Sequence, residues 1–187
     1  MGRTPSSLRQ PLGSKSVDRP VVLVGMMGAG KSTIGRRLAK RLHLPFVDSD
    51  SEIEQAAGLS ISDIFSRYGE GEFRDGERRV IARLLRAGPC VLATGGGAFV
   101  QTDTRADILA NGIAVWLDVP VETLVERTAR RNTRPLLQSG DPATILREML
   151  ATREHFYALS PIHIASGVAP HAQAVDTICA ALKDYLA

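Results

Sequence analysis

Short apolar runs alternate with longer segments of mixed polarity from about residue 20 to the end of the chain. The runs are almost continuously apolar, which is typical of strands that are covered on both faces of a parallel sheet. They predict five strands, at residues 20–25, 45–48, 90–94, 113–118 and 162–165. Their alternation with helical segments indicates an α/β fold with right-handed crossovers between parallel strands.

Eight segments between and after these strands are predicted to be helices. They cover residues 31–43, 51–57, 60–68, 71–86, 102–110, 121–131, 142–159 and 170–186. Ser60 and Asp63 have the spacing of a variant capping box, and Pro120 and Pro142 suit the first turns of two other helices. Gly76 lies inside a predicted helix, where glycine costs about 1 kcal/mol relative to alanine, which favours a kink there.

The first 19 residues differ in composition from the rest of the chain. They are rich in Ser, Pro, Gly and Arg and have no apolar period, so they predict a disordered basic tail, with a targeting peptide as the alternative. Residues 20–187 would form a single domain, which is long enough for one sizeable core.

Charge and hydrophobicity exclude some classes of function. The sequence pI of about 9.1 suggests nucleic-acid binding, but residues 1–19 hold four basic residues against one acidic residue. Their net charge of +3 equals that of the whole chain, so the body is neutral and we expect no nucleic-acid partner. No stretch approaches the ~18 consecutive apolar residues of a membrane span, so we expect no membrane contact.

Neither the cysteines nor the histidines have the spacing of a metal site. Cys90 and Cys179 are far apart, which indicates buried thiols in a reducing compartment, and we therefore expect a cytoplasmic protein. The histidines are interpreted as surface or supporting residues: His43, His155, His163 and His171.

Residues 25–32, GMMGAGKS, match the phosphate-binding pattern G-x-x-x-x-G-K-[ST] and lie between a predicted strand and a predicted helix. Glycines let the backbone form a concave loop whose N–H groups face phosphate oxygens. Lys31 would reach the β- and γ-phosphates, Ser32 would coordinate Mg²⁺, and Thr33 would contact the α-phosphate. The predicted ATP site also includes Gly28, Ala29 and Gly30.

Two carboxylates, Asp48 and Asp50, lie at the end of the second predicted strand, at the edge where ligands bind in open parallel sheets. In an extended strand they would point to the same side, one near Mg²⁺ and one near an acceptor hydroxyl. The alternative is that Asp50 caps the helix that follows.

Three further segments carry candidate chemistry. EFRDGERRV, at residues 72–80, bears arginines and on its own suggests only a solvated helix face. The three consecutive glycines at residues 95–97 would let backbone approach a ligand closely. The arginine-rich residues 126–137 suit either a nucleic-acid patch or a mobile lid that closes on a triphosphate.

Five segments together resemble the shikimate kinase family of P-loop small-molecule kinases: GMMGAGKSTIGRRLA, FVDSDSEIE, ISDIFSRYGEGEFRDGE, TGGGAF and NTRPLL. The resemblance covers about residues 20–186. It implies a three-layer fold with a five-stranded parallel sheet and a lid at about residues 126–141. It also implies a monomer that transfers the ATP γ-phosphate to the 3-hydroxyl of shikimate, with Mg²⁺, in aromatic amino-acid biosynthesis.

The resemblance assigns the acceptor side of the site. Asp50 would hold shikimate hydroxyls and serve as the base, and Asp48 would support the Mg²⁺ hydration shell. Arg74 would bind the shikimate carboxylate, and Glu77 would orient that arginine. Gly96 would contact shikimate through its backbone.

On the nucleotide side, the resemblance makes Arg134 a lid arginine that reaches phosphate and substrate, and it counts Lys31 as catalytic with it. On the acceptor side, Arg153, from an R-x-x-x-Y pattern, would join Arg74 as a second arginine for the shikimate carboxylate. Arg127 and Pro170 would enclose the adenine.

Three other functions remain open. A gluconate kinase would share the loop and a carboxylate grip, although it should not need the DSD, EFR and GGG segments together. A catalytically silent ATP-binding module would lack Lys31, Asp50 or Arg134, all of which are present. A nucleic-acid-binding P-loop protein would show a steep salt dependence.

Overall fold

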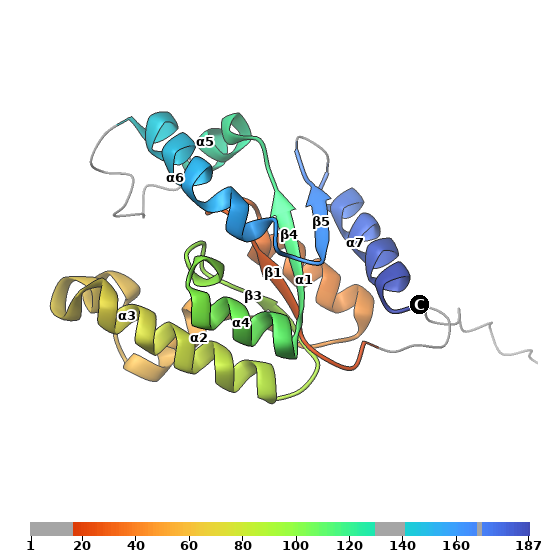
Figure 1. Ribbon diagram of the computed structural model, residues 1–187, viewed down its shortest axis with the longest axis horizontal. Helices are drawn as coiled ribbons and strands as arrows, with labels where there is room; N and C mark the ends of the chain where they lie inside the picture. The colour runs from red at the N-terminus through yellow and green to blue at the C-terminus, as the bar shows by residue number, and fades with distance from the viewer. Residues whose placement is uncertain (1–16, 130–140, 168–169) are drawn as a thin grey trace, which may run out of the picture.

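A computed structural model describes residues 17–129, 141–167 and 170–187 (Figure 1). It contains one parallel sheet with the strand order β2-β3-β1-β4-β5. The strands are β1 Val21–Val24, β2 Phe46–Asp48, β3 Val91–Ala93, β4 Ile113–Asp118 and β5 Ile162–Ala165. The predicted α/β fold is confirmed, and all five predicted strands are present, three of them one or two residues shorter than expected.

Helices cover both faces of the sheet. In chain order they are α1 Lys31–Leu42, α2 Ser49–Ala57, α3 Ile61–Arg86, α4 Thr102–Asn111, α5 Val121–Ala129, α6 Pro142–Tyr157 and α7 His171–Tyr185, with a 3₁₀ turn, η1, at Ala98–Val100. α1 and α7 pack together on one face, whereas α4, η1 and α6 lie on the other (Figure 1). The fold therefore has three layers.

The central strand β1 explains the apolar runs in the sequence. All four of its residues are completely buried, because neighbouring strands and helices cover both of its edges and both of its faces. Gly35 lets α1 approach this core closely. A Cβ at Gly35 would lie 2.6 Å from the Phe46 ring and 3.2 Å from Leu23, so a larger residue would push the helix away.

α3 joins two of the predicted helices. The interruption is at Gly69, whose φ of 81° and ψ of 176° are not helical, whereas the chain is helical at Gly76. The expected kink at Gly76 is therefore wrong. Ser60 caps the helix as expected, since it accepts from the Asp63 N–H at 3.1 Å and donates to the Asp63 carboxylate at 2.6 Å.

Two predictions concern residues that the structure describes only in part. Most of the predicted tail, residues 1–16, and most of the predicted lid, residues 130–140, lie outside the described ranges. Within those ranges, no helix has both the length and the apolar character needed to cross a membrane.

Candidate active site

The P-loop connects β1 to α1, and its shape depends on glycines. Gly25, Gly28 and Gly30 have φ values of 130°, 80° and 91°, a region that side-chain-bearing residues rarely adopt. Gly30 caps α1 without a side chain, which leaves the first N–H groups of the helix to face an anion. Lys31 is 8% exposed, and its Nζ donates to the carbonyls of Gly25 at 2.7 Å and Met26 at 2.8 Å. The lysine side chain thus lies along the P-loop, where it would neutralise a bound phosphate.

Ser32 and Asp48 bring two oxygen ligands together beside the loop. Ser32 Oγ donates to Asp48 Oδ2 at 2.7 Å, and Asp48 Oδ1 accepts from the Asp50 N–H at 3.1 Å. The cap of α2 is Asp48, and α2 begins at Ser49. The interpretation of Asp50 as the cap is therefore wrong, and so is the expectation that both carboxylates extend from one strand.

Asp50 instead faces the acceptor side from the first turn of α2. A Cβ at Gly95 would lie 3.0 Å from Asp50 Oδ1 and 2.9 Å from Glu77 Oε1, so both carboxylates line the backbone of the glycine turn. Glu77 is 1% exposed. Burial raises the pKa of Glu77, and the charge of Asp50 adds to this effect, whereas Arg74 opposes it.

Arg74 is held by two carboxylates of its own helix. Its Nη1 donates to Glu77 at 2.6 Å, and its Nη2 donates to Glu70 at 3.1 Å. Burial acts to lower the pKa of Arg74, but the charges and hydrogen bonds of these carboxylates raise it overall. The guanidinium lies against the glycine turn, because a Cβ at Gly97 would be 2.7 Å from Nη1. Glu77 therefore orients Arg74 over Gly97, and the forked donors of a guanidinium held in this way suit an anion.

Tyr157, at the end of α6, was not predicted as a separate site residue. It is completely buried, and its hydroxyl donates to the Gly96 carbonyl. Burial raises the pKa of Tyr157, while Arg153, through its charge and a hydrogen bond, and Arg74, through its charge, act to lower it. Both predicted carboxylate-binding arginines therefore lie near Tyr157. The Tyr of the R-x-x-x-Y pattern was the only sequence signal for it.

Arg127, which was predicted to contact the adenine, connects two segments. Its Nη2 donates to the Gly167 carbonyl at 3.1 Å, and its Nη1 donates to the Ala29 carbonyl at 3.5 Å, so it joins the P-loop to the segment after β5. Pro170 is exposed and caps α7. Thr33 follows Ser32 in the first turn of α1. Arg134 lies outside the described residues.

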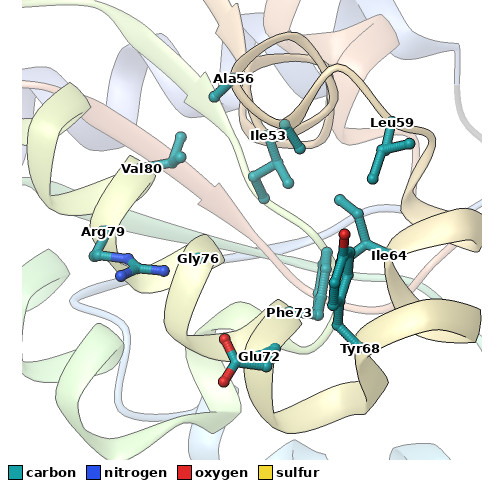
Figure 2. Close-up of a pocket in the computed structure, with 11 residues that line it drawn as sticks. Ile53, Ala56, Leu59, Ile64, Tyr68, Glu72, Phe73, Gly76, Arg79 and Val80 are labelled. Atoms are coloured by element: carbon teal, nitrogen blue, oxygen red, sulfur yellow. The ribbon is translucent and has the colours of Figure 1, made fainter.

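A cavity of about 410 Å³ lies away from these residues, between α2 and α3 (Figure 2). Ile53, Ile64 and Phe73 line its apolar part, and Glu72 and Arg79 also belong to its wall. None of the predicted site residues lines it.

Known proteins are similar to this chain along nearly its whole length. The family model for shikimate kinase matches residues 27–183. A shikimate kinase of Novosphingobium aromaticivorans is 55% identical over 92% of this chain and 91% of its own length. Another, from Zymomonas mobilis, is 52% identical over 90% of this chain and 96% of its own length.

Solved structures show the same likeness. The shikimate kinase from Acinetobacter baumannii in complex with shikimate has a TM-score of 0.86 and 39% identity, and covers 89% of this chain and 94% of its own. A gluconokinase from Sinorhizobium meliloti has a TM-score of 0.58 and 18% identity, over 90% of this chain and 93% of its own, and so shares the fold alone. Since the family model matches most of the residues and relatives more than half identical cover nine-tenths of them, the chain belongs to the shikimate kinase family.

Proposed function

We propose that this protein transfers the γ-phosphoryl group of ATP to the 3-hydroxyl of shikimate, giving shikimate 3-phosphate and ADP. One observation supports the proposal most directly. The glycine turn at residues 95–97 contacts the P-loop on one side, where a Cβ at Gly96 would lie 3.2 Å from the Met27 nitrogen. On the other side it contacts Arg74 and Asp50. A phosphate site and a site for an anionic alcohol thus adjoin the same turn.

The acceptor side suits shikimate, which is a carboxylate with three hydroxyl groups. Arg74 and Arg153 would hold the carboxylate through forked hydrogen bonds, with Glu77 fixing Arg74. Asp50 would accept hydrogen bonds from the hydroxyls and take the proton of the 3-hydroxyl as it attacks. The Gly96 backbone, held through its carbonyl by Tyr157, would complete the pocket.

The phosphate side would work mainly by positioning and charge neutralisation. The N–H groups of residues 28–33 would hold the phosphate chain, and Lys31 and Arg134 would neutralise the group in transfer. Arg127 and Pro170 would hold the adenine.

Ser32 and Asp48 fit a magnesium ion. Both offer hard oxygen ligands that already meet at 2.7 Å, and Mg²⁺ prefers a few such ligands with water and phosphate oxygens. When bound, the ion would neutralise phosphate charge. The chain would act as a cytoplasmic monomer without nucleic-acid or membrane partners, and light scattering after gel filtration tests the monomer.

The decisive experiment measures ADP release from MgATP with shikimate as acceptor, beside gluconate and a panel of nucleoside monophosphates. Strong release with shikimate, abolished in Asp50→Asn while ATP binding persists, supports the proposal and the role of Asp50. Release with another acceptor would overturn the substrate. ATP binding without release for any acceptor would indicate a silent module.

A further inference from the structure

His171, the first residue of α7, lies against the last glycine of the P-loop. A Cβ at Gly30 would be 3.4 Å from His171 Cε1 and 3.7 Å from Arg127 Nη1. The imidazole and the guanidinium therefore flank the residue at which the loop becomes helix α1. This is where a bound phosphate chain meets the helix N-terminus.

The two ring nitrogens of His171 have different surroundings. Nδ1 is buried, and no hydrogen-bond partner meets it within the described part of the chain. Nε2 also has no hydrogen-bond partner among the described residues. A buried N–H without an acceptor costs more than a buried lone pair, so the proton of the neutral ring belongs on Nε2. The ring thus keeps an N–H donor on Nε2, next to the Cε1 atom that faces the last glycine of the P-loop.

The charges around His171 favour a neutral ring and an anionic partner. Burial lowers its pKa, and the positive charges of Arg127 on α5 and Arg37 on α1 lower it further. Arg127 donates only to backbone carbonyls, and neither arginine forms an ion pair with a carboxylate in the described ranges. Arg127, which has no carboxylate partner among the described residues, and the positive charge of Arg37 favour an anionic oxygen over a neutral hydroxyl beside this N–H donor.

We propose that His171 is a nucleotide-binding residue whose Nε2–H donates a hydrogen bond to a phosphate oxygen of bound ATP or ADP. The inference rests on the proposed use of ATP and extends it by one residue. No spacing in the sequence indicated this role, because the residues that define it come from separate elements.

Three variants test the hydrogen bond. His171→Phe keeps the ring shape but removes the donor, and it should fold normally because it also removes the unpartnered Nδ1. The amide nitrogen of His171→Gln can occupy the position of Nε2, whereas that of His171→Asn reaches only as far as Nδ1. A hydrogen bond to a charged group predicts roughly ten-fold weaker binding for the Phe and Asn variants. The Gln variant should stay close to the wild type.

The measurement is calorimetric titration with MgADP, and separately with shikimate, alongside thermal unfolding. Weaker MgADP binding in the Phe and Asn variants, with shikimate affinity and unfolding temperature unchanged, supports the proposal. Unchanged MgADP affinity in the Phe variant overturns it, as does an equal loss in the Gln variant or a parallel loss of shikimate affinity. A wild-type protein that binds no MgADP would instead refute the proposed function.

Discussion

Replacing Gly97 by alanine tests the acceptor side without straining the backbone. Gly97 has a φ of −94° and a ψ of −13°, which alanine adopts freely. The new methyl group would overlap Arg74 Nη2 and lie 2.7 Å from Nη1 and 2.8 Å from Cζ, whereas ordinary contacts begin at 3.4 Å. The guanidinium must therefore move by roughly 1 Å away from the turn that it covers.

This displacement should damage binding far more than folding. The atoms that clash are the end of a flexible side chain, so we expect less than about 1 kcal/mol of destabilisation. A misplacement of about 1 Å in a positioned group costs up to ~100-fold in rate. We therefore predict that kcat/KM for shikimate falls between ten- and a hundred-fold in Gly97→Ala, which corresponds to roughly 1.4–2.7 kcal/mol, with MgATP affinity unchanged.

Steady-state kinetics with varied shikimate provides the assay, and Gly76→Ala is the matched control. Gly76 lies on the same helix as Arg74, but a Cβ there meets nothing within 4 Å. The control should keep full activity and gain about 0.5–1 kcal/mol of stability. A wild-type KM for shikimate and a wild-type kcat in Gly97→Ala would refute the assignment of Arg74 to the carboxylate.

Three further predictions follow from buried contacts. Gly35→Ala should lower the free energy of unfolding in urea by about 1–3 kcal/mol, because its Cβ would overlap the Phe46 ring; an unchanged midpoint would contradict the packing. Tyr157→Phe should raise the KM for shikimate several-fold without changing that for ATP, since the Gly96 carbonyl loses its donor; equal changes in both would argue against a local role. The pKa of Glu77 lies above its ordinary 4.5, so the folded state binds this proton more tightly than the unfolded state. The stabilisation from Glu77 is therefore present below pH 4.5 and is lost as the pH rises through its folded-state pKa. The free energy of unfolding of the wild type relative to that of Glu77→Gln should fall from pH 4 to pH 8. Denaturant titrations in which this difference grows would refute the prediction.

The sequence predicted those features that local physics determines. β1 was evident because a strand buried on every side must be apolar throughout. The P-loop was evident because positive φ angles demand glycine at fixed spacing. Both signals lie within a few residues of the structure that they specify.

The remaining features depend on contacts between distant segments. The hydrogen bond from Tyr157 to Gly96 joins residues 61 positions apart, and the packing of Arg74 on Gly97 also crosses between elements. Local signals could not choose between Asp48 and Asp50 as the cap, because the strand passes into α2 without a loop. Arg134 lies outside the described residues, and its role stays a prediction.

The position of the kink in α3 also depends on contacts between segments that are distant in the sequence. Gly69 and Gly76 are equally able to bend a helix, but Gly76 lies between Phe73 and Val80, which pack against α2 in the small cluster with Ile53. Packing holds that turn helical, so the bend is left to Gly69.

This small cluster has a consequence for the order in which the protein opens. α2 and the first half of α3 are held by a core of their own, centred on Ile53, Ile64 and Phe73, which is far smaller than the main core and borders the 410 Å³ cavity. We expect such a segment to form a cooperative unit of low stability that opens before the rest of the protein. Its amide hydrogens should exchange with solvent faster than those of β1. Because the unit carries Asp50 and ends beside Arg74, bound shikimate should slow that exchange by mass action.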